Sequence, residues 1–145
     1  MFQRGYLLKL FIDASAFIAR LDKKDVHHGA TIEAFSAIAR GVYKYNRLYT
    51  SNYVLDESVT HILYRRKRHD HALRMLDLIT NSQYITMLWV TESVQSKAIS
   101  LFRKYTDQLL SITDCTSAIL MNDYNIDAIF TFDGDFEVLR FETIP

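Results

Sequence analysis

Short runs of bulky apolar residues alternate along the chain with longer segments in which apolar residues recur every three or four positions. Runs of about 4–8 such residues bounded by polar ones are typical of strands in a covered sheet. The strands that we predict on this pattern occupy residues 7–12, 46–51, 84–90 and 128–132, with one more in EVLRFETI at 137–144.

The longer segments have the periodicity of amphipathic helices. We predict helices over residues 14–21, 25–40, 52–68, 69–80, 91–105 and 113–125. Their core-facing stripes are expected to include Val26, Ala30, Phe35 and Ile38 in the second helix, and Leu73, Leu76 and Ile79 in the fourth. Short polar side chains at helix starts accept hydrogen bonds from free amides. The N-caps expected on this basis are Asp25, either Thr91 or Ser93, and Thr113.

Strands that alternate with helices predict the α/β class, and here a three-layer α/β/α sandwich with a mainly parallel central sheet. At 145 residues the chain most simply forms one domain, residues 1–145. In such folds, ligands bind where the strands end at their carboxyl termini. That edge of the sheet is therefore the place to look for chemistry.

Four acidic residues end an apolar or β-like run or follow one within a turn; the run before Asp114 is LLSIT. Asp13 and Asp133 end their apolar runs, Glu57 lies in the first turns of the helix after the second run, and Asp114 lies at a helix start. In a parallel sheet these carboxylates would share one edge. Each acid alone is also explained as a cap or turn residue, and Asp133-Gly134 between apolar segments favours a tight hairpin.

Carboxylates gathered at one place repel each other unless a positive charge neutralises them. Hard divalent cations do so, and Mg²⁺ is commonly held by a few carboxylates while it keeps several waters. Such an ion lowers the pKa of bound water and stabilises charge on a phosphoryl group. The acids thus point to metal-assisted phosphoryl chemistry.

Composition and charge restrict the partners. The apolar fraction is 49% and the charged fraction 23%, as in ordinary globular proteins, and the single cysteine excludes an internal disulfide, which favours the cytoplasm. The charged opening segment favours a strand over a signal peptide, and no apolar run reaches the length of a membrane span. The net charge is zero, but residues 1–74 hold 13 basic and 7 acidic side chains, whereas residues 75–145 hold 4 and 10.

Four segments resemble the motifs of PIN-domain proteins, most closely the VapC-type toxin ribonucleases of toxin–antitoxin pairs. The segments are FIDASAFIARLDKKDVHH, YTSNYVLDESVT, SITDCTSAILM and IFTFDGDF, in the order of the family. The motif residues are Asp13 and Ser15 in the first, Glu57 in the second, Asp114 in the third, and Thr131, Asp133 and Phe136 in the fourth. One departure is Arg140 before Phe141, where the family often has Gly.

This resemblance implies a single α/β/α domain, commonly a homodimer, that hydrolyses phosphodiester bonds in RNA with Mg²⁺ or Mn²⁺. It also implies a partner, a small antitoxin whose C-terminal segment covers the groove and blocks the acids. The residues Asp13, Asp114 and Asp133 would form the metal centre, and Glu57 would complete it or orient the attacking water. Asp135 is a peripheral candidate ligand or a turn residue, and Ser15 and Thr131 would hold the carboxylates in place.

Other features leave alternatives open. The basic run Arg65, Arg66, Lys67 and Arg68 would suit RNA phosphates, but it equally suits a solvated helix end. The pairs His27-His28 and His69-x-His71 are expected to be surface histidines, because further transition-metal ligands at suitable spacing are lacking.

Several other functions compete with a toxin nuclease. A haloacid-dehalogenase-like phosphatase would have Asp rather than Ser15, and a receiver would have a lysine after Lys104, where this chain has none. A non-catalytic PIN module that binds RNA or protein, and a housekeeping RNA-processing nuclease, remain as alternatives.

Overall fold

The computed structural model describes residues 8–145, so the first residues of the opening segment and residue 7 of the first predicted strand lie outside it. The described strands are β1 (Leu8–Ile12), β2 (Tyr45–Ser51), β3 (Ile85–Leu88), β4 (Ala128–Phe130) and β5 (Glu142–Ile144). The described helices are α1 (Ala14–Leu21), α2 (His28–Ala39), α3 (Asn52–Arg66), α4 (His69–Thr80), α5 (Glu92–Lys104), α6 (Ile112–Asp123) and α7 (Asp135–Val138).

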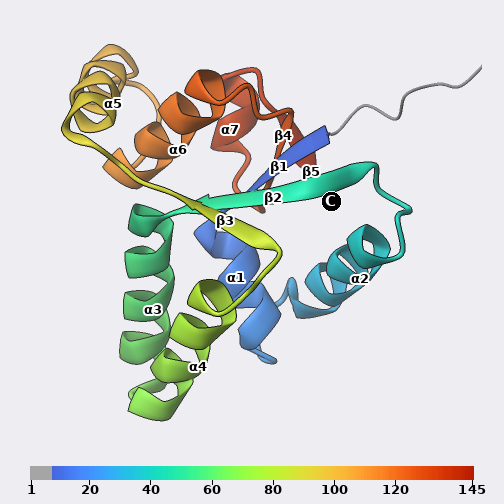
Figure 1. Ribbon diagram of the computed structural model, residues 1–145. Helices are drawn as coiled ribbons and strands as arrows, with labels where there is room; N and C mark the ends of the chain where they lie inside the picture. The colour runs from blue at the N-terminus through green and yellow to red at the C-terminus, as the bar shows by residue number, and fades with distance from the viewer. Residues whose placement is uncertain (1–7) are drawn as a thin grey trace, which may run out of the picture.

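The five strands form one sheet in the order β3-β2-β1-β4-β5, and every neighbouring pair is parallel. Helices α1 to α4 cover one face and α5 to α7 lie on the other (Figure 1). The predicted three-layer α/β/α sandwich is therefore confirmed, with a sheet that is parallel throughout. None of the helices within residues 8–145 combines the length and the apolar character needed to cross a bilayer.

The central strands are apolar because both of their faces are covered. In β1, Leu10, Phe11 and Ile12 are completely buried, as are the three residues of β4 beside them. The register aligns Ile12 with Phe130, and the amide of Asp13 donates to the carbonyl oxygen of Phe130 at 3.0 Å. Two strand ends more than a hundred residues apart in the sequence are thereby fixed side by side.

The segment after β4 differs from the prediction. The hairpin expected at Asp133-Gly134 is wrong, since the chain forms the short helix α7 there. The strand expected over residues 137–144 is present only in its last part, as β5. β5 is parallel to β4, so the connection has to cross over the sheet rather than reverse in a tight turn. Phe136, completely buried on α7, anchors this crossover in the core.

Three helix details also differ. The cap of α6 is Ser111 rather than Thr113, and α2 begins at His28 without a cap from Asp25. Of the two candidates for α5, Thr91 is the cap, because its hydroxyl accepts from the amide of Val94 at 3.3 Å.

Three residues that were expected to face the core, Val26, Ala30 and Leu73, are instead exposed. Val26 is 90% exposed because it precedes α2, and Leu73 is 46% exposed because α4 turns Ala72, Met75 and Ile79 inward. Other members of the two expected stripes, Phe35, Ile38 and Ile79, do pack in or against the core.

Candidate metal centre

Three of the four predicted acids lie where the chain leaves a strand at its carboxyl end, and the fourth lies at the start of α6. Asp13 ends β1 and is the first residue before α1, and Asp133 follows β4 closely. Glu57 lies in the second turn of α3, the helix that begins directly after β2, and Asp114 lies in the first turn of α6.

Asp13 is held by two hydroxyl groups. Thr131 Oγ1 donates to Asp13 Oδ2 at 2.8 Å, Ser15 Oγ donates to the same oxygen at 3.1 Å, and the two hydroxyls are 3.2 Å apart. Burial raises the pKa of Asp13 although Thr131, the Ala14 amide and Ser15 all donate to it, and the charge of Asp133 raises it further. A buried carboxylate that stays harder to ionise despite three donors is a strong candidate for a functional site.

The same hydroxyls hold the segment that carries Asp133. Thr131 Oγ1 accepts from the amide of Asp133 at 3.0 Å, and Ser15 Oγ accepts from the amide of Phe132 at 3.1 Å. Ser15 and Thr131 therefore join Asp13 to the segment that carries Asp133.

Asp114 belongs to a capping box. Ser111 Oγ accepts from the amide of Asp114, and Asp114 Oδ2 accepts from the amide of Ser111, each at 3.0 Å. Burial raises the pKa of Asp114 to about 6, the bonds with Ser111 oppose this, and the charges of Asp13 and Asp133 add to it. One oxygen of Asp114 is thus used by the helix end, and the other is available to a ligand.

Glu57 experiences all of these charges. Loss of water around the carboxyl group raises its pKa to about 7, and the charges of Asp13, Asp114, Asp133 and Asp56 follow in that order. The outer part of the side chain is exposed, so solvent screens the effect and its energetic weight is smaller than at Asp114. The shared repulsion is nevertheless direct support for placing the four acids around one space.

Asp135 lies one step further out, in the first turn of α7. Its amide donates to Asp133 Oδ1 at 2.9 Å, so the turn between the two residues is closed by Asp133. Partial burial raises the pKa of the Asp135 carboxyl, and the charge of Asp133 raises it as well. Its backbone has a turn role, and a role for its carboxylate as a ligand stays a prediction.

Comparison with known proteins shows which family this chain belongs to. The family model of the PIN domain matches residues 10–142. This chain belongs to the PIN-domain family. It is 25% identical over 128 residues to the VapC ribonuclease of Archaeoglobus fulgidus, which covers 88% of this chain and 78% of that protein. It is 28% identical over 132 residues to the 23S rRNA-specific endonuclease VapC20 of Mycobacterium tuberculosis, which covers 91% and 95%.

Solved structures agree with this fold. The crystal structure of Mycobacterium tuberculosis VapC20, described as a sarcin-ricin loop cleaving toxin, has a TM-score of 0.81 and 26% identity over 91% of this chain and 95% of that chain. VapBC2 from Rickettsia felis, solved with a DNA fragment from its promoter, has a TM-score of 0.69 and 11% identity over 94% and 98%, which supports the fold alone.

The acids of this PIN domain fit a hydrated divalent ion. Among residues 8–145, no three His, Cys, Asp or Glu side chains converge closely enough to form a ready-made metal cage. Mg²⁺ rarely uses such a cage, because it binds through one or two carboxylates and retains water. Over the same residues, the ion pairs all involve acids other than the four discussed. These carboxylates, of which Asp13, Glu57 and Asp114 have raised pKa values, have no protein cation and are the donor set that such an ion would complete.

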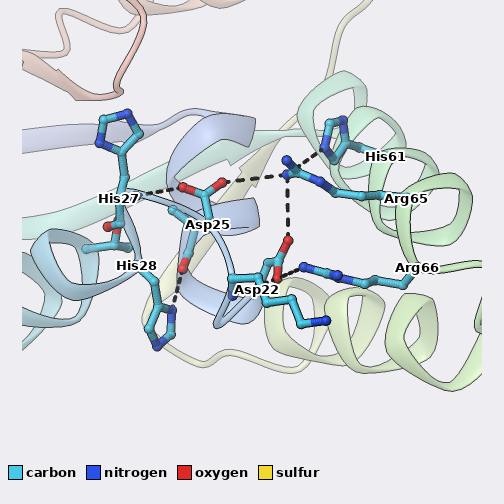
Figure 2. A network of polar contacts seen from close by, with 10 residues as sticks. Asp22, Asp25, His27, His28, His61, Arg65 and Arg66 are labelled. Atoms are coloured by element: carbon cyan, nitrogen blue, oxygen red, sulfur yellow. Dashed lines mark hydrogen bonds and ion pairs between the residues drawn. The ribbon is translucent and has the colours of Figure 1, made fainter.

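The basic run has other contacts in the structure. Arg66 is bonded to Asp22, and Arg65 Nη1 lies 3.6 Å from Asp22 Oδ2 and 3.8 Å from Asp25 Oδ2 (Figure 2). Outside that network, Arg68 pairs with Asp70 at 2.9 Å and Lys67 ends α3 with a positive φ of 51°. RNA contact by Arg65, Arg66, Lys67 and Arg68 stays a prediction, but the first two have a structural role.

Sequence reasoning missed three contributors to this region of the PIN domain. Ser111 had a recognisable signal, since a Ser three residues before an acid is a capping-box pattern. Asp22 and the stacked pair His27–Phe132 had none, because only the tertiary structure brings their partners together. Cys115, beside Asp114, is buried, and burial raises the pKa of its thiol, as is typical of a structural cysteine.

Proposed function

We propose that this PIN domain is a divalent-metal-dependent endoribonuclease that hydrolyses phosphodiester bonds in RNA as the toxin of a toxin–antitoxin pair. The observation that carries the proposal is the set of four mutually repelling acids, of which Asp114 and Glu57 have pKa values raised to about 6 and about 7. The VapC ribonuclease and the VapC20 endonuclease, with which the chain shares most of its length, support the choice of RNA as substrate.

In this proposal Asp13, Asp114 and Asp133 hold Mg²⁺ or Mn²⁺, and Asp135 is a peripheral candidate. The bound ion would supply an activated water and stabilise negative charge at the phosphorus. Thr131 and Ser15 orient Asp13 and the Asp133 segment, which fixes the ligand positions before substrate arrives.

In this proposal, Glu57 is the residue that handles the proton. A carboxylate with a raised pKa, about 7 for Glu57 in the metal-free protein, is suited to accept a proton from the attacking water. The water oxygen forms a bond to phosphorus, the bond from phosphorus to the leaving oxygen breaks, and that oxygen takes a proton from solvent. Glu57 then returns its proton to solvent.

The partners follow from the same proposal. The RNA substrate reaches the acid edge of the sheet in the cytoplasm, and an antitoxin protein covers this edge to prevent cleavage. We further propose a homodimer, and the family model that spans residues 10–142 supports one nuclease domain per chain. The two-subunit proposal is tested by the mass of the purified protein in light scattering.

The deciding experiment incubates purified protein with a panel of structured and unstructured RNAs in Mg²⁺ or Mn²⁺, beside EDTA. We expect cleavage that EDTA and Asp114→Asn abolish. The matched control is Asp77→Asn, which removes an exposed carboxylate on α4 and should leave cleavage unchanged. Cleavage that survives EDTA or Asp114→Asn would contradict the mechanism, and no cleavage of any RNA would favour a non-catalytic binding module.

A further inference from the structure

A stacked aromatic pair lies beside the proposed metal centre. The rings of His27 and Phe132 are parallel, with an interplanar angle of 8° and centroids 4.2 Å apart. Phe132 stands between Thr131, which donates to Asp13, and Asp133, and its own amide is bonded to Ser15. The imidazole of His27 is therefore fixed next to the chain segment that carries the acids.

The His27 ring does not serve the core. The Phe132 ring already packs against Phe130, with an edge-on geometry and centroids 6.0 Å apart, while His27 covers it from outside and remains exposed. None of the hydrogen bonds within residues 8–145 uses a ring nitrogen of His27; the backbone of that residue makes the local bonds. One face of the imidazole is thus covered by Phe132, while the His27 side chain as a whole remains exposed.

The backbone beneath this ring is held on both sides. The amide of His27 donates to Asp25 Oδ1 at 2.8 Å, and its carbonyl oxygen accepts from Thr31 Oγ1 at 2.8 Å. Asp25 is in turn paired with Arg65 of α3. Figure 2 shows the His27 ring at one end of this network, turned away from Asp25 and the arginines.

The start of the loop is held as well. Asp22 is buried, bonds to Arg66 and accepts from the amide of Lys24 at 3.0 Å. His28, the neighbour of His27, has Nδ1 at 2.7 Å from the carbonyl oxygen of Ala19 (Figure 2). A loop held by this many hydrogen bonds and ion pairs loses little conformational entropy when a ligand binds. The affinity for a ligand that stacks on the loop is therefore higher.

An exposed aromatic face on a rigid loop suits a nucleobase. Proteins commonly bind unpaired RNA bases by stacking them on aromatic side chains, histidine included. We propose that the outer face of His27 stacks one unpaired base of the RNA, adjacent to the phosphate at the acid cluster, and so positions the strand for cleavage. The inference rests on the proposed function and deepens it by naming a substrate contact.

The test measures binding without cleavage, in an Asp114→Asn parent. The probes are a fluorescein-labelled ten-nucleotide polyadenylate RNA and a ten-unit abasic ribose-phosphate chain with the same charge, compared by fluorescence anisotropy. We expect His27→Ala to raise the Kd for polyadenylate about tenfold, the size of effect known for base–aromatic stacking, and to change the Kd for the abasic chain less than about twofold. His27→Phe keeps an aromatic face and should bind polyadenylate within about threefold of the parent.

His69→Ala is the matched control, because it removes another exposed histidine at the start of α4. Equal losses for both probes would overturn the inference in favour of a phosphate contact, and so would a His27→Phe variant as weak as His27→Ala. A parent that does not prefer polyadenylate to the abasic chain, or a His27→Ala variant that binds like the parent, would overturn it too. Since no cleavage is measured, failure of this inference is distinct from failure of the nuclease proposal.

Discussion

The two ends of α1 show two ways to bury a carboxylate. Asp13 precedes the helix and is 4% exposed, and Asp22 follows it and is 6% exposed. Burial raises the pKa of Asp13, and the neighbouring Asp133 adds repulsion. Burial also opposes ionisation of Asp22, but the hydrogen bond and charge of Arg66, with help from Arg65, outweigh it and lower the pKa.

The difference lies in where the compensating cation is. Asp22 has its cations within the chain, so its charge is satisfied once α1 and α3 pack together. Asp13 has hydroxyl and amide donors but no cation, and its acidic neighbours increase the deficit. Burial alone does not identify a functional acid; burial without an internal counter-charge is the informative property.

The largest expected effect comes from neutralising each of the two acids in turn. Asp22→Asn should lower the free energy of unfolding by about 3 kcal/mol, because it leaves Arg66 and Arg65 close to an amide that cannot balance them. Asp13→Asn should abolish cleavage and keep or raise the stability of the metal-free protein, because an amide replaces a carboxyl that burial disfavours. Urea unfolding in EDTA measures the free energy of unfolding of each variant, and an RNA cleavage assay measures activity.

The contrast is specific to these sites. Asp77→Asn, on the exposed side of α4, should change neither quantity and serves as the control. If Asp13→Asn were as destabilising as Asp22→Asn, both acids would be structural and the comparison would fail.

A smaller effect is expected from the hydroxyl that joins Asp13 to the Asp133 segment. Thr131→Val keeps the volume but removes the bonds to Asp13 and to the Asp133 amide, and should reduce metal affinity or cleavage roughly 10- to 100-fold. Thr116→Val is the control, since its hydroxyl bonds only to the carbonyl oxygen of Thr113. Metal titration by calorimetry measures the effect, and equal losses in both variants would show that the result reflects packing alone.

The smallest expected effect is a dependence on pH. Asp114 and Glu57 have pKa values raised to about 6 and about 7, so in the metal-free protein they favour folding at acid pH, and this contribution is lost as pH rises through those values. Asp22 acts in the opposite direction, because its lowered pKa stabilises the fold above the ordinary aspartate value and is lost only in acid.

A divalent ion should reverse the pH dependence that is expected from Asp114 and Glu57 in the metal-free protein. Because the ion requires ionised carboxylates, its affinity should be about tenfold weaker near pH 5 than near pH 7. Thermal unfolding with and without Mn²⁺ across this range measures the change, and Asp114→Asn should flatten it. Stabilisation by Mn²⁺ that did not vary with pH would place the ion elsewhere.

The fold class and the positions of two of the acids could be predicted because they depend on local sequence patterns. The alternation of apolar runs and amphipathic segments was sufficient for the α/β/α class, and the strand-ending positions of Asp13 and Asp133 were sufficient to place acids at one edge. The crossover after β4 could not be predicted, because Asp133-Gly134 has the local chemistry of a hairpin and only parallel pairing of β5 with β4 rules it out.

The loop between α1 and α2 shows a second limit. The arginines that bind Asp22 and Asp25 are some forty residues away, so the basic run looked free from the sequence. His27 and Phe132, which stack on each other, are even further apart in the sequence. Neither residue type by itself indicates that such a stack will form.

The bond from Thr131 to Asp13 joins residues 118 positions apart, and this separation has a consequence for the timing of synthesis. At about 5–20 residues per second, a ribosome that has just added Asp13 needs roughly 6–24 seconds to reach Thr131. Throughout that interval the first acid has no partner from the fourth motif, and the strand that will lie beside it does not yet exist. A chain still being translated is therefore unable to join Asp13 to Thr131, and the first and fourth motifs meet only when synthesis is almost complete.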